Sequence, residues 1–260
     1  MPRLPHPRPV RRRRPLTRFT VAAVLLLVSA PAHAQVRVAS SVALRSVLDA
    51  LTPDYVQSTK QTVTPVFGLA ADIKTRIEKG EPFDVAILTP AMLDELATKG
   101  LLDATPRPVI ARSGLGLMIK AGAPKPDVTS ADAFKRTLTG ARAVTYVGTG
   151  ASGIAFVATL EKLGIAPMLK GRTKVAASTD EVNANISSGA ADLAVLPVSE
   201  ILPVRGAELG GIFPAAIQSY IVMAAGVNPR SPRAAAAKAF VSFLTAERNT
   251  PVIRAHGMER

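Results

Sequence analysis

Residues 36–51 read Val-Arg-Val-Ala-Ser-Ser-Val-Ala-Leu-Arg-Ser-Val-Leu-Asp-Ala-Leu, and this stretch decides the fold. Its first part, 36–40, is a short β-like run, and from 44 to 51 the apolar residues recur at helical spacing. Two further apolar runs, 62–67 and 83–88, alternate with helical patterns in the same way. Such alternation is typical of an α/β fold with buried, parallel strands.

A second α/β series follows a Pro-rich break at residues 105–108. We expect its strands at 114–120, 141–147, 174–177 and 192–197, and its helices at 130–138, 153–163 and 179–188. The tail adds a strand at 219–227 and an Ala-rich helix at 232–245. Two similar α/β series favour a protein of two lobes over one with a single sheet. The tail could add its strand and helix to the first lobe, which would make that lobe discontinuous in sequence.

Residues 1–34 differ in composition from the rest of the chain. They contain seven arginines and no acidic residue, then an apolar run at 19–28, then Ala32-His-Ala34. This combination is typical of a cleaved secretory signal, and the apolar run is too short to span a bilayer. We therefore expect export to the periplasm, by the Sec or the twin-arginine route. The alternative is a basic nucleic-acid-binding arm with a membrane anchor.

The expected cleavage changes the interpretation of the charge. The whole chain carries a net charge of +13, but residues 35–260 hold 25 basic and 19 acidic residues, a net +6. The basic residues are scattered and aromatic residues make up only 4% of the chain. This pattern suits a small anionic ligand and does not predict binding to nucleic acid.

The residues for enzyme chemistry are sparse. There is no cysteine, which excludes disulfides, thiolate metal sites and a lipid-anchored cysteine. Of the three histidines, His6 and His33 belong to the signal, and His256 lies near the C-terminus. We therefore expect no catalytic residues, no metal site and no cofactor. Asp84 is either a binding acid or, as its position at a strand start favours, a partner of neighbouring backbone.

The sharpest local motif is Gly148-Thr-Gly-Ala-Ser-Gly153, between a strand and a helix. It matches the dinucleotide fingerprint but lacks the expected acidic residue about 20 positions later. A glycine loop at a helix start also suits an oxyanion, although Thr149 and Ser152 are equally suited to capping a helix. Ser40 and Ser41 occupy the matching position after the first strand. Together the two helix starts predict a clamp for a small anion.

Several segments, taken in order and spacing, resemble the periplasmic molybdate-binding protein family, the solute receptors of ABC importers. They are Val38-Ala-Ser-Ser-Val-Ala-Leu-Arg-Ser-Val-Leu48, Phe67-Gly-Leu-Ala-Ala-Asp-Ile-Lys-Thr-Arg-Ile-Glu-Lys-Gly80, Phe83-Asp-Val-Ala-Ile-Leu88, Gly150-Ala-Ser-Gly-Ile154, Ala191-Asp-Leu-Ala-Val-Leu-Pro-Val-Ser-Glu-Ile201, Ala239-Phe-Val-Ser-Phe-Leu-Thr245 and Pro251-Val-Ile-Arg-Ala-His-Gly-Met-Glu259. The resemblance implies a two-lobed type II periplasmic binding fold, with mixed, mostly parallel sheets and helices on both faces. Lobe 1 would comprise 35–112 plus 219–260, and lobe 2 would comprise 113–218.

The resemblance also implies a ligand site in the cleft between the lobes. The family's first oxyanion serine falls on Ser40 or Ser41, its second-lobe helix start on Ser152 and Gly153, and a backbone donor on Val182. The family's second oxyanion serine is replaced by Leu69 and Ala70, and its cleft tyrosine by Leu196 or Pro197.

Two hydroxyl ligands are therefore missing, each worth about 1.5–3 kcal/mol to a charged group. We expect a small anion, either a molybdate- or tungstate-like oxyanion or, as the lost hydroxyls favour, an organic carboxylate. The implied partner is an ABC permease in the membrane, and we expect a monomer. The alternatives are an exported oxidoreductase that uses residues 148–153, and a ligand sensor for a membrane receptor.

Overall fold

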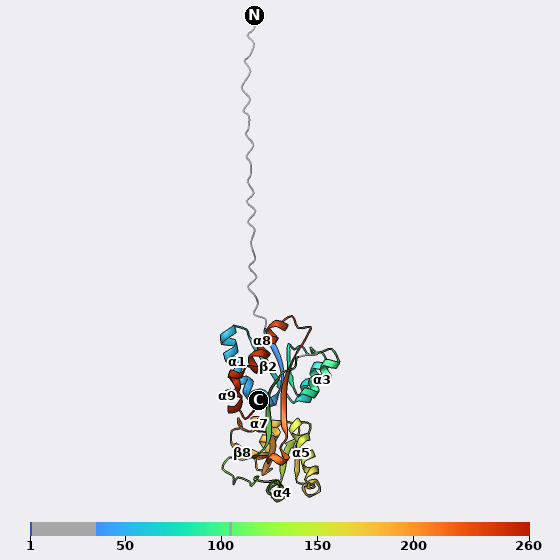
Figure 1. Ribbon diagram of the computed structural model, residues 1–260, viewed down its shortest axis with the longest axis vertical. Coiled ribbons are helices and arrows are strands. Elements are labelled where there is room, and N and C mark those ends of the chain that lie inside the picture. Colours follow the sequence, from blue (N-terminus) through green and yellow to red (C-terminus); the bar gives the residue numbers. More distant parts are fainter. Residues whose placement is uncertain (2–34, 104–105) are drawn as a thin grey trace. The chain divides into compact units, whose positions relative to one another are not determined.

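The computed structural model describes Met1 and residues 35–103 and 106–260 (Figure 1). The expected signal peptide beyond Met1 therefore lies outside the described residues, as do His6 and His33. Within the part that is described, no helix is both long and apolar enough to cross a membrane.

The first half of the fold confirms the predicted β-α-β-α-β-α order. In chain order its elements are β1 (Val36–Ser41), η1 (Val42–Leu44), α1 (Arg45–Thr59), β2 (Val63–Gly68), α2 (Ala70–Glu78), β3 (Val85–Leu88) and α3 (Pro90–Thr98). β1 lies between β2 and β3 and is parallel to both. β9 (Tyr220–Val227) then pairs antiparallel with β3, so the tail returns to this sheet.

The second half contains the second α/β series. Its elements are β4 (Val109–Lys120), α4 (Ala131–Gly140), β5 (Val144–Val147), α5 (Ala151–Lys162), η2 (Ala166–Leu169), β6 (Thr173–Ala176), α6 (Thr179–Ser187), β7 (Leu193–Pro197), α7 (Val198–Ile201), β8 (Ala207–Ile212) and η3 (Ala215–Ile217). β5 is parallel to β6 and β7, whereas β4 is antiparallel to β7 and β8.

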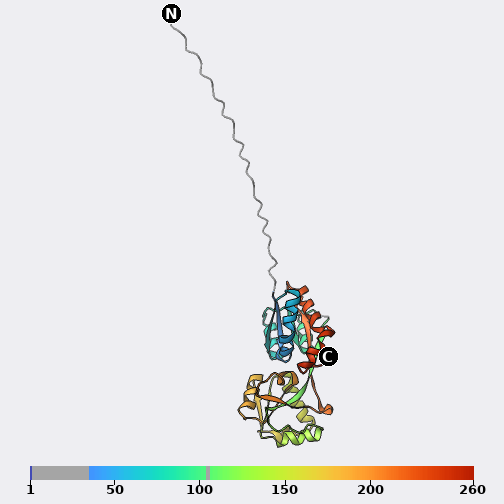
Figure 2. The ribbon, with the colours of Figure 1, turned by 90° about the vertical axis from the view of Figure 1, so that its left-hand side faces the viewer.

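One long strand connects the two halves. Residues 109–114 of β4 pair with β9, and residues 115–120 pair with β7 and β8. The strand order is β2-β1-β3-β9-β4-β7-β5-β6, with β8 attached to β4. Figure 2 shows the strands of each half as a separate group linked by β4 and the segment before β9. The chain passes from one group of strands to the other within β4 and returns just before β9. The division into lobe 1 (35–112 plus 219–260) and lobe 2 (113–218) stays a prediction.

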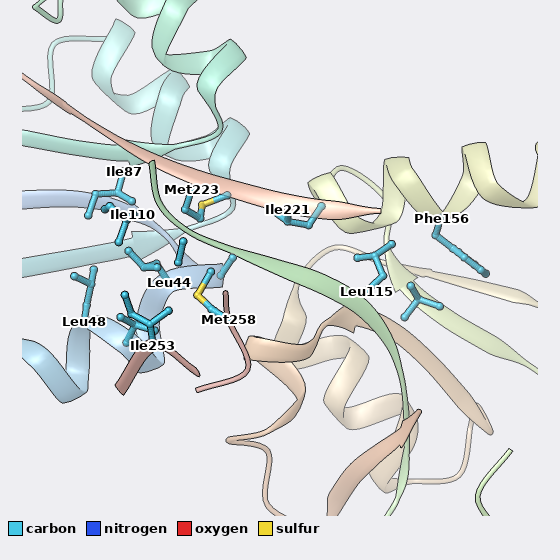
Figure 3. Close-up of a cluster of buried hydrophobic side chains, with 14 of the residues drawn as sticks. Leu44, Leu48, Ile87, Ile110, Leu115, Phe156, Ile221, Met223, Ile253 and Met258 are labelled. Atoms are coloured by element: carbon cyan, nitrogen blue, oxygen red, sulfur yellow. The ribbon is translucent and has the colours of Figure 1, made fainter. Parts of the chain in front are cut away.

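Helices cover both faces of the first half-sheet. Val85 and Ile87 of β3 belong to a core that includes residues of α1, α8 (Ala234–Thr245) and α9 (Thr250–Ala255). Ala86 and Leu88 face the other way and pack with residues of α2 and α3. Successive strand residues point to opposite faces, so a strand that is apolar throughout requires a helix layer on each side. Part of the first core is drawn in Figure 3, with Leu44, Leu48, Ile87, Met223 and Ile253 gathered together.

Asp84 has a structural role. Its buried carboxylate accepts hydrogen bonds from the Arg37 N–H at 2.7 Å, from Arg233 Nε at 3.0 Å and from the Ser231 hydroxyl. Burial raises the pKa of this carboxyl, but the three hydrogen bonds outweigh burial and hold the pKa below its usual value. The side chain thus joins the start of β3 to β1 and to the segment before α8. Of the two interpretations the structural one fits, although only the Arg37 donor is backbone and the Ser231 and Arg233 donors are side chains.

Three differences from the sequence-based prediction have physical causes. α1 continues through Pro53, since Leu51 and Tyr55 on either side of it are buried in the core. β4 begins at Val109, five residues earlier than expected, because β9 supplies hydrogen-bonding partners there. β8 was not predicted, because its sequence Ala-Glu-Leu-Gly-Gly-Ile lacks a strand pattern and its pairing comes from β4.

Candidate functional site

Two adjoining cavities lie where the helix starts of the two halves face each other. The small cavity has a volume of about 20 Å³, and five predicted site residues line it: Ser41, Leu69, Ala70, Ser152 and Leu196. The large cavity has a volume of about 780 Å³ and is open to solvent. Val42, Leu69, Thr179 and Glu200 line both, so they form the wall that the two cavities share.

The remaining three predicted residues line neither cavity. Ser40 is fully buried, and its hydroxyl donates to the Ser41 carbonyl at 3.0 Å. Gly153 and Val182 are buried in the second half. Of the two candidate serines of β1, Ser41 is therefore the one beside a cavity. Its hydroxyl accepts a hydrogen bond from the Ala43 N–H at 3.3 Å and caps the 3-10 turn η1.

The glycine loop has a packing function that needs no nucleotide. A Cβ atom on Gly153 would lie 1.9 Å from the Val147 carbonyl oxygen, so only glycine lets α5 approach β5 this closely. The residue before the first turn of α5 is Gly150, and no side chain of the described residues caps this helix. The N–H groups at the start of α5 thus adjoin the small cavity without a side-chain cap, and Ser152 lies in this first turn.

The small cavity has room for about one water molecule, given that a water needs roughly 10–15 Å³ of such space. A polyatomic anion does not fit there in this arrangement of the chain. The large cavity falls within the range of about 300–1,000 Å³ that is usual for small-molecule sites.

Arg45 is the most prominent cation of the large cavity. It is the first residue of α1, and its guanidinium carbon lies 4.3 Å from the centre of the Phe67 ring. Its side chain is exposed, and it forms no salt bridge with any residue that the structure describes. Stacking on the ring fixes the plane of the guanidinium while leaving its N–H groups free for a ligand.

Glu200 is the carboxyl that the two cavities share. It lies on α7, and the Thr179 hydroxyl at the start of α6 donates to its Oε2 at 2.8 Å. Burial raises the pKa of Glu200 to about 7, although the Thr179 hydrogen bond and the nearby charge of Arg45 both lower it. A carboxyl with such a pKa exchanges its proton near neutrality.

The cavity also contains other charges. Asp49, Asp72 and Asp180 line it together with Arg205. All four of these side chains are exposed, so water screens them more than it screens Glu200. Among the described residues, no group of three or more His, Asp or Glu side chains is placed to hold a metal ion.

Ser199 connects the two halves beneath the large cavity. Its hydroxyl donates to the Ala43 carbonyl at 2.9 Å, and its N–H donates to the Ser113 hydroxyl at 3.1 Å. Ser113 donates in turn to the Gly257 carbonyl at 3.1 Å. The chain of hydrogen bonds is buried and ties α7 to η1, β4 and the C-terminal segment.

Sequence reasoning missed Arg45, Thr179 and Glu200. Glu200 is 155 residues from Arg45 along the chain, and neither has a motif around it that marks a ligand site. Only the fold brings the start of α1 near α6 and α7. The available signal was positional: Arg45 and Thr179 each begin a helix that follows a strand.

Comparison with known proteins gives one relative with an enzyme name. The aconitate isomerase of Pseudomonas sp. is 29% identical over 190 residues, which cover 72% of this chain and 71% of the relative.

Solved structures show the same fold. The periplasmic molybdate-binding protein of Azotobacter vinelandii superposes with a TM-score of 0.73 at 21% identity, covering 86% of this chain and 99% of that one. The sulfate-binding protein SubI from Mycobacterium tuberculosis H37Rv gives a TM-score of 0.71 at 17% identity, covering 87% and 86%. The predicted α/β fold, that of the type II periplasmic binding proteins, is confirmed.

The model of one protein family matches nearly the whole described chain, residues 36–259. The family and the two solved structures are those of binding proteins, in agreement with the resemblance seen in the sequence. The chain therefore belongs to the bacterial extracellular solute-binding protein family.

Proposed function

We propose that this protein is the periplasmic receptor of an ABC importer and that it binds a small organic carboxylate in the large cavity. The observation that carries the proposal is Arg45, an arginine without a salt-bridge partner in the described chain, stacked on Phe67 at the cavity wall. A guanidinium fixed in this way matches the geometry of a carboxylate through two parallel hydrogen bonds.

The lining of the small cavity supports a carboxylate over a bare metal oxyanion. Leu69, Ala70 and Leu196 present apolar side chains where an oxyanion site needs hydroxyl donors. A ligand with a carbon skeleton in the large cavity can place apolar atoms against Leu69, which lines both cavities, and direct its charge at Arg45. Because the small cavity holds about one water molecule in this arrangement, Ser41 and Ser152 would reach such a ligand only once the lobes have moved and the small cavity has widened.

The proposed transport cycle uses the predicted lobes. The segments between the half-sheets, at the middle of β4 and just before β9, would serve as the hinge. Ligand binding closes lobe 2 (113–218) on lobe 1, and the closed monomer docks on a membrane permease. Residues 1–34 would direct export and then be removed.

A thermal-shift screen of molybdate, tungstate, sulfate and di- and tricarboxylates tests the ligand class. A ligand at 100 times its Kd stabilises the fold by about 2.7 kcal/mol, which raises Tm by roughly 5–10 °C for a chain of this size. Calorimetry on the hits then gives the affinities. Tight binding of molybdate or tungstate with no response to any carboxylate overturns the proposal.

A second candidate function is the isomerisation of an unsaturated carboxylate. It is favoured by the likeness to an aconitate isomerase together with Glu200, a carboxyl beside the cavity whose pKa is near neutrality. Binding and isomerisation use the same cavity and are compatible. Incubation of the purified protein with trans-aconitate, followed by chromatography for the cis isomer, tests this candidate directly.

The two alternatives from the sequence are less well supported. The glycine loop of the oxidoreductase hypothesis is explained by helix packing at Gly153. A sensor would share the receptor's ligand site and differ only in its membrane partner. Copurification of the ligand-loaded protein with a permease or with a receptor kinase separates these two functions.

A further inference from the structure

We propose that Glu200 is the acid–base residue that moves the double bond of an unsaturated polycarboxylate bound beside Arg45. The inference rests on the second candidate function and assigns its chemistry to one side chain. Glu200 lines both cavities and shares the large one with Arg45 and with Thr179, so a ligand held by the arginine lies in the same space as the carboxyl.

The surroundings of Glu200 suit a group that both takes and gives a proton. Its Oε2 is held by the Thr179 hydroxyl at 2.8 Å, and no hydrogen bond from a described residue occupies its Oε1. The pKa of about 7 means that both protonation states are populated at neutral pH. A base with a pKa near the working pH is the most effective one.

The charged side chains around Glu200 determine which ligand charge the cavity favours. On α1, Arg45 faces Glu200, and Asp49 lies one turn further along the helix. The other charged residues of the cavity are Asp72 on α2, Asp180 on α6 and Arg205 after α7. A polycarboxylate is attracted by Arg45 and Arg205 and repelled by Asp49, Asp72 and Asp180, so its carboxylates must lie beside the two arginines. Its charge also raises the pKa of Glu200 further, since like charges disfavour ionisation. Ligand binding is therefore coupled to the protonation of Glu200.

The proton shift balances without any other reagent. The Glu200 carboxylate removes a proton from the CH₂ group next to the double bond, and the C–H electron pair forms the new C=C bond. The former π pair then takes a proton from the Glu200 carboxyl at the distal carbon, so Glu200 ends as the carboxylate. Arg45 would stabilise the negative charge that develops on the ligand carboxylate between the two steps.

The test is proton NMR of trans-aconitate with the purified mature protein in D₂O, over a range of pH from 5 to 9. We expect the cis isomer to appear, with a rate that rises as Glu200 deprotonates and levels off above its pKa. Glu200→Gln should slow the reaction by about 100-fold or more, the usual share of a general acid–base group, while calorimetry at pH 5.5 shows trans-aconitate affinity within about threefold of wild type. Glu161→Gln, on the exposed side of α5, is the control and should retain the full rate.

A third variant separates a chemical role of Glu200 from a structural one. Thr179→Val removes a hydrogen bond that lowers the pKa of Glu200, so the midpoint of the pH profile should move upward. Binding of trans-aconitate by wild type without formation of the cis isomer at any pH overturns the inference and leaves the receptor function standing. Turnover that survives in Glu200→Gln overturns the assignment to Glu200. If neither trans-aconitate nor any other carboxylate binds, both proposals fail.

Discussion

Arg45 contributes two separate properties to the cavity, a positive charge and a fixed plane. The charge is available to a ligand because no acidic residue that the structure describes forms a salt bridge with Arg45. The plane of the guanidinium is fixed by stacking on the Phe67 ring. At the scale of one residue, we expect substitution of Arg45 to affect the proposed ligand binding more than folding, since its side chain is exposed.

Arg45→Met should weaken the binding of the best carboxylate roughly 10- to 100-fold, because hydrogen bonds to charged groups contribute about 1.5–3 kcal/mol each. Calorimetry measures the change. The matched control is Arg248→Met, since Arg248 also stacks on a phenylalanine, Phe243, but lies outside the cavity. Equal losses in the two variants would show that the effect does not come from the ligand site.

Glu200 also affects stability at the residue scale. Its pKa is higher in the folded chain than in the unfolded chain, so its contribution to stability is fully present below about pH 4.5 and is lost as pH rises to about 7. The unfolding free energy of Glu200→Gln minus that of wild type should therefore increase by roughly 1–3 kcal/mol as pH rises from 4.5 to 8. Urea denaturation at the two pH values measures the difference, and a difference independent of pH contradicts the raised pKa.

At the scale of elements, the junction of β5 and α5 depends on one missing side chain. Gly153→Ala places a Cβ against the Val147 carbonyl, and because backbone cannot move aside as a side chain can, we expect a loss of about 3 kcal/mol or more in unfolding free energy. Gly140→Ala is the control, because no atom of the described residues lies within 4 Å of a Cβ there. If Gly153→Ala proves as stable as Gly140→Ala, the close approach of α5 to β5 is wrong.

The same scale shows which features the sequence could predict. Short apolar runs between helical patterns identified β1, β3, β5 and β7, since most residues of these strands are buried. The alternation with helices also identified β2 and β6, although most of their residues are exposed or half-buried. β8 and the first residues of β4 were not predicted from the sequence, because they form strands only by pairing with distant segments. Ser41 and Ser152 could be predicted to line a cavity because they follow strands, whereas Glu200 borders both cavities only because the fold brings distant segments together.

At the scale of the whole molecule, the buried hydrogen bonds of Ser199 link the two halves. Ser199→Ala removes the bond to the Ala43 carbonyl, which exists only while α7 and η1 are together. If the ligand binds this arrangement, its affinity should fall about fivefold, as expected for the loss of one hydrogen bond of about 1 kcal/mol. Ser188→Ala is the control, because among the described residues the Ser188 hydroxyl bonds only within its own segment: it donates to the carbonyls of Ala184 and Asn185 and accepts from the Ala190 N–H. An unchanged affinity in the Ser199 variant would show that binding does not require the link.

The large cavity has a practical consequence for reporter design. Its rim includes the exposed Asp72 of α2, in the first half, and the exposed Asp180 of α6, in the second half. The chain contains no cysteine, so Asp72→Cys with Asp180→Cys would create a pair of thiols that dyes can label without background. A donor and an acceptor on these positions would turn any relative motion of the halves into an optical signal, and the protein into a fluorescent sensor for the molecule it captures.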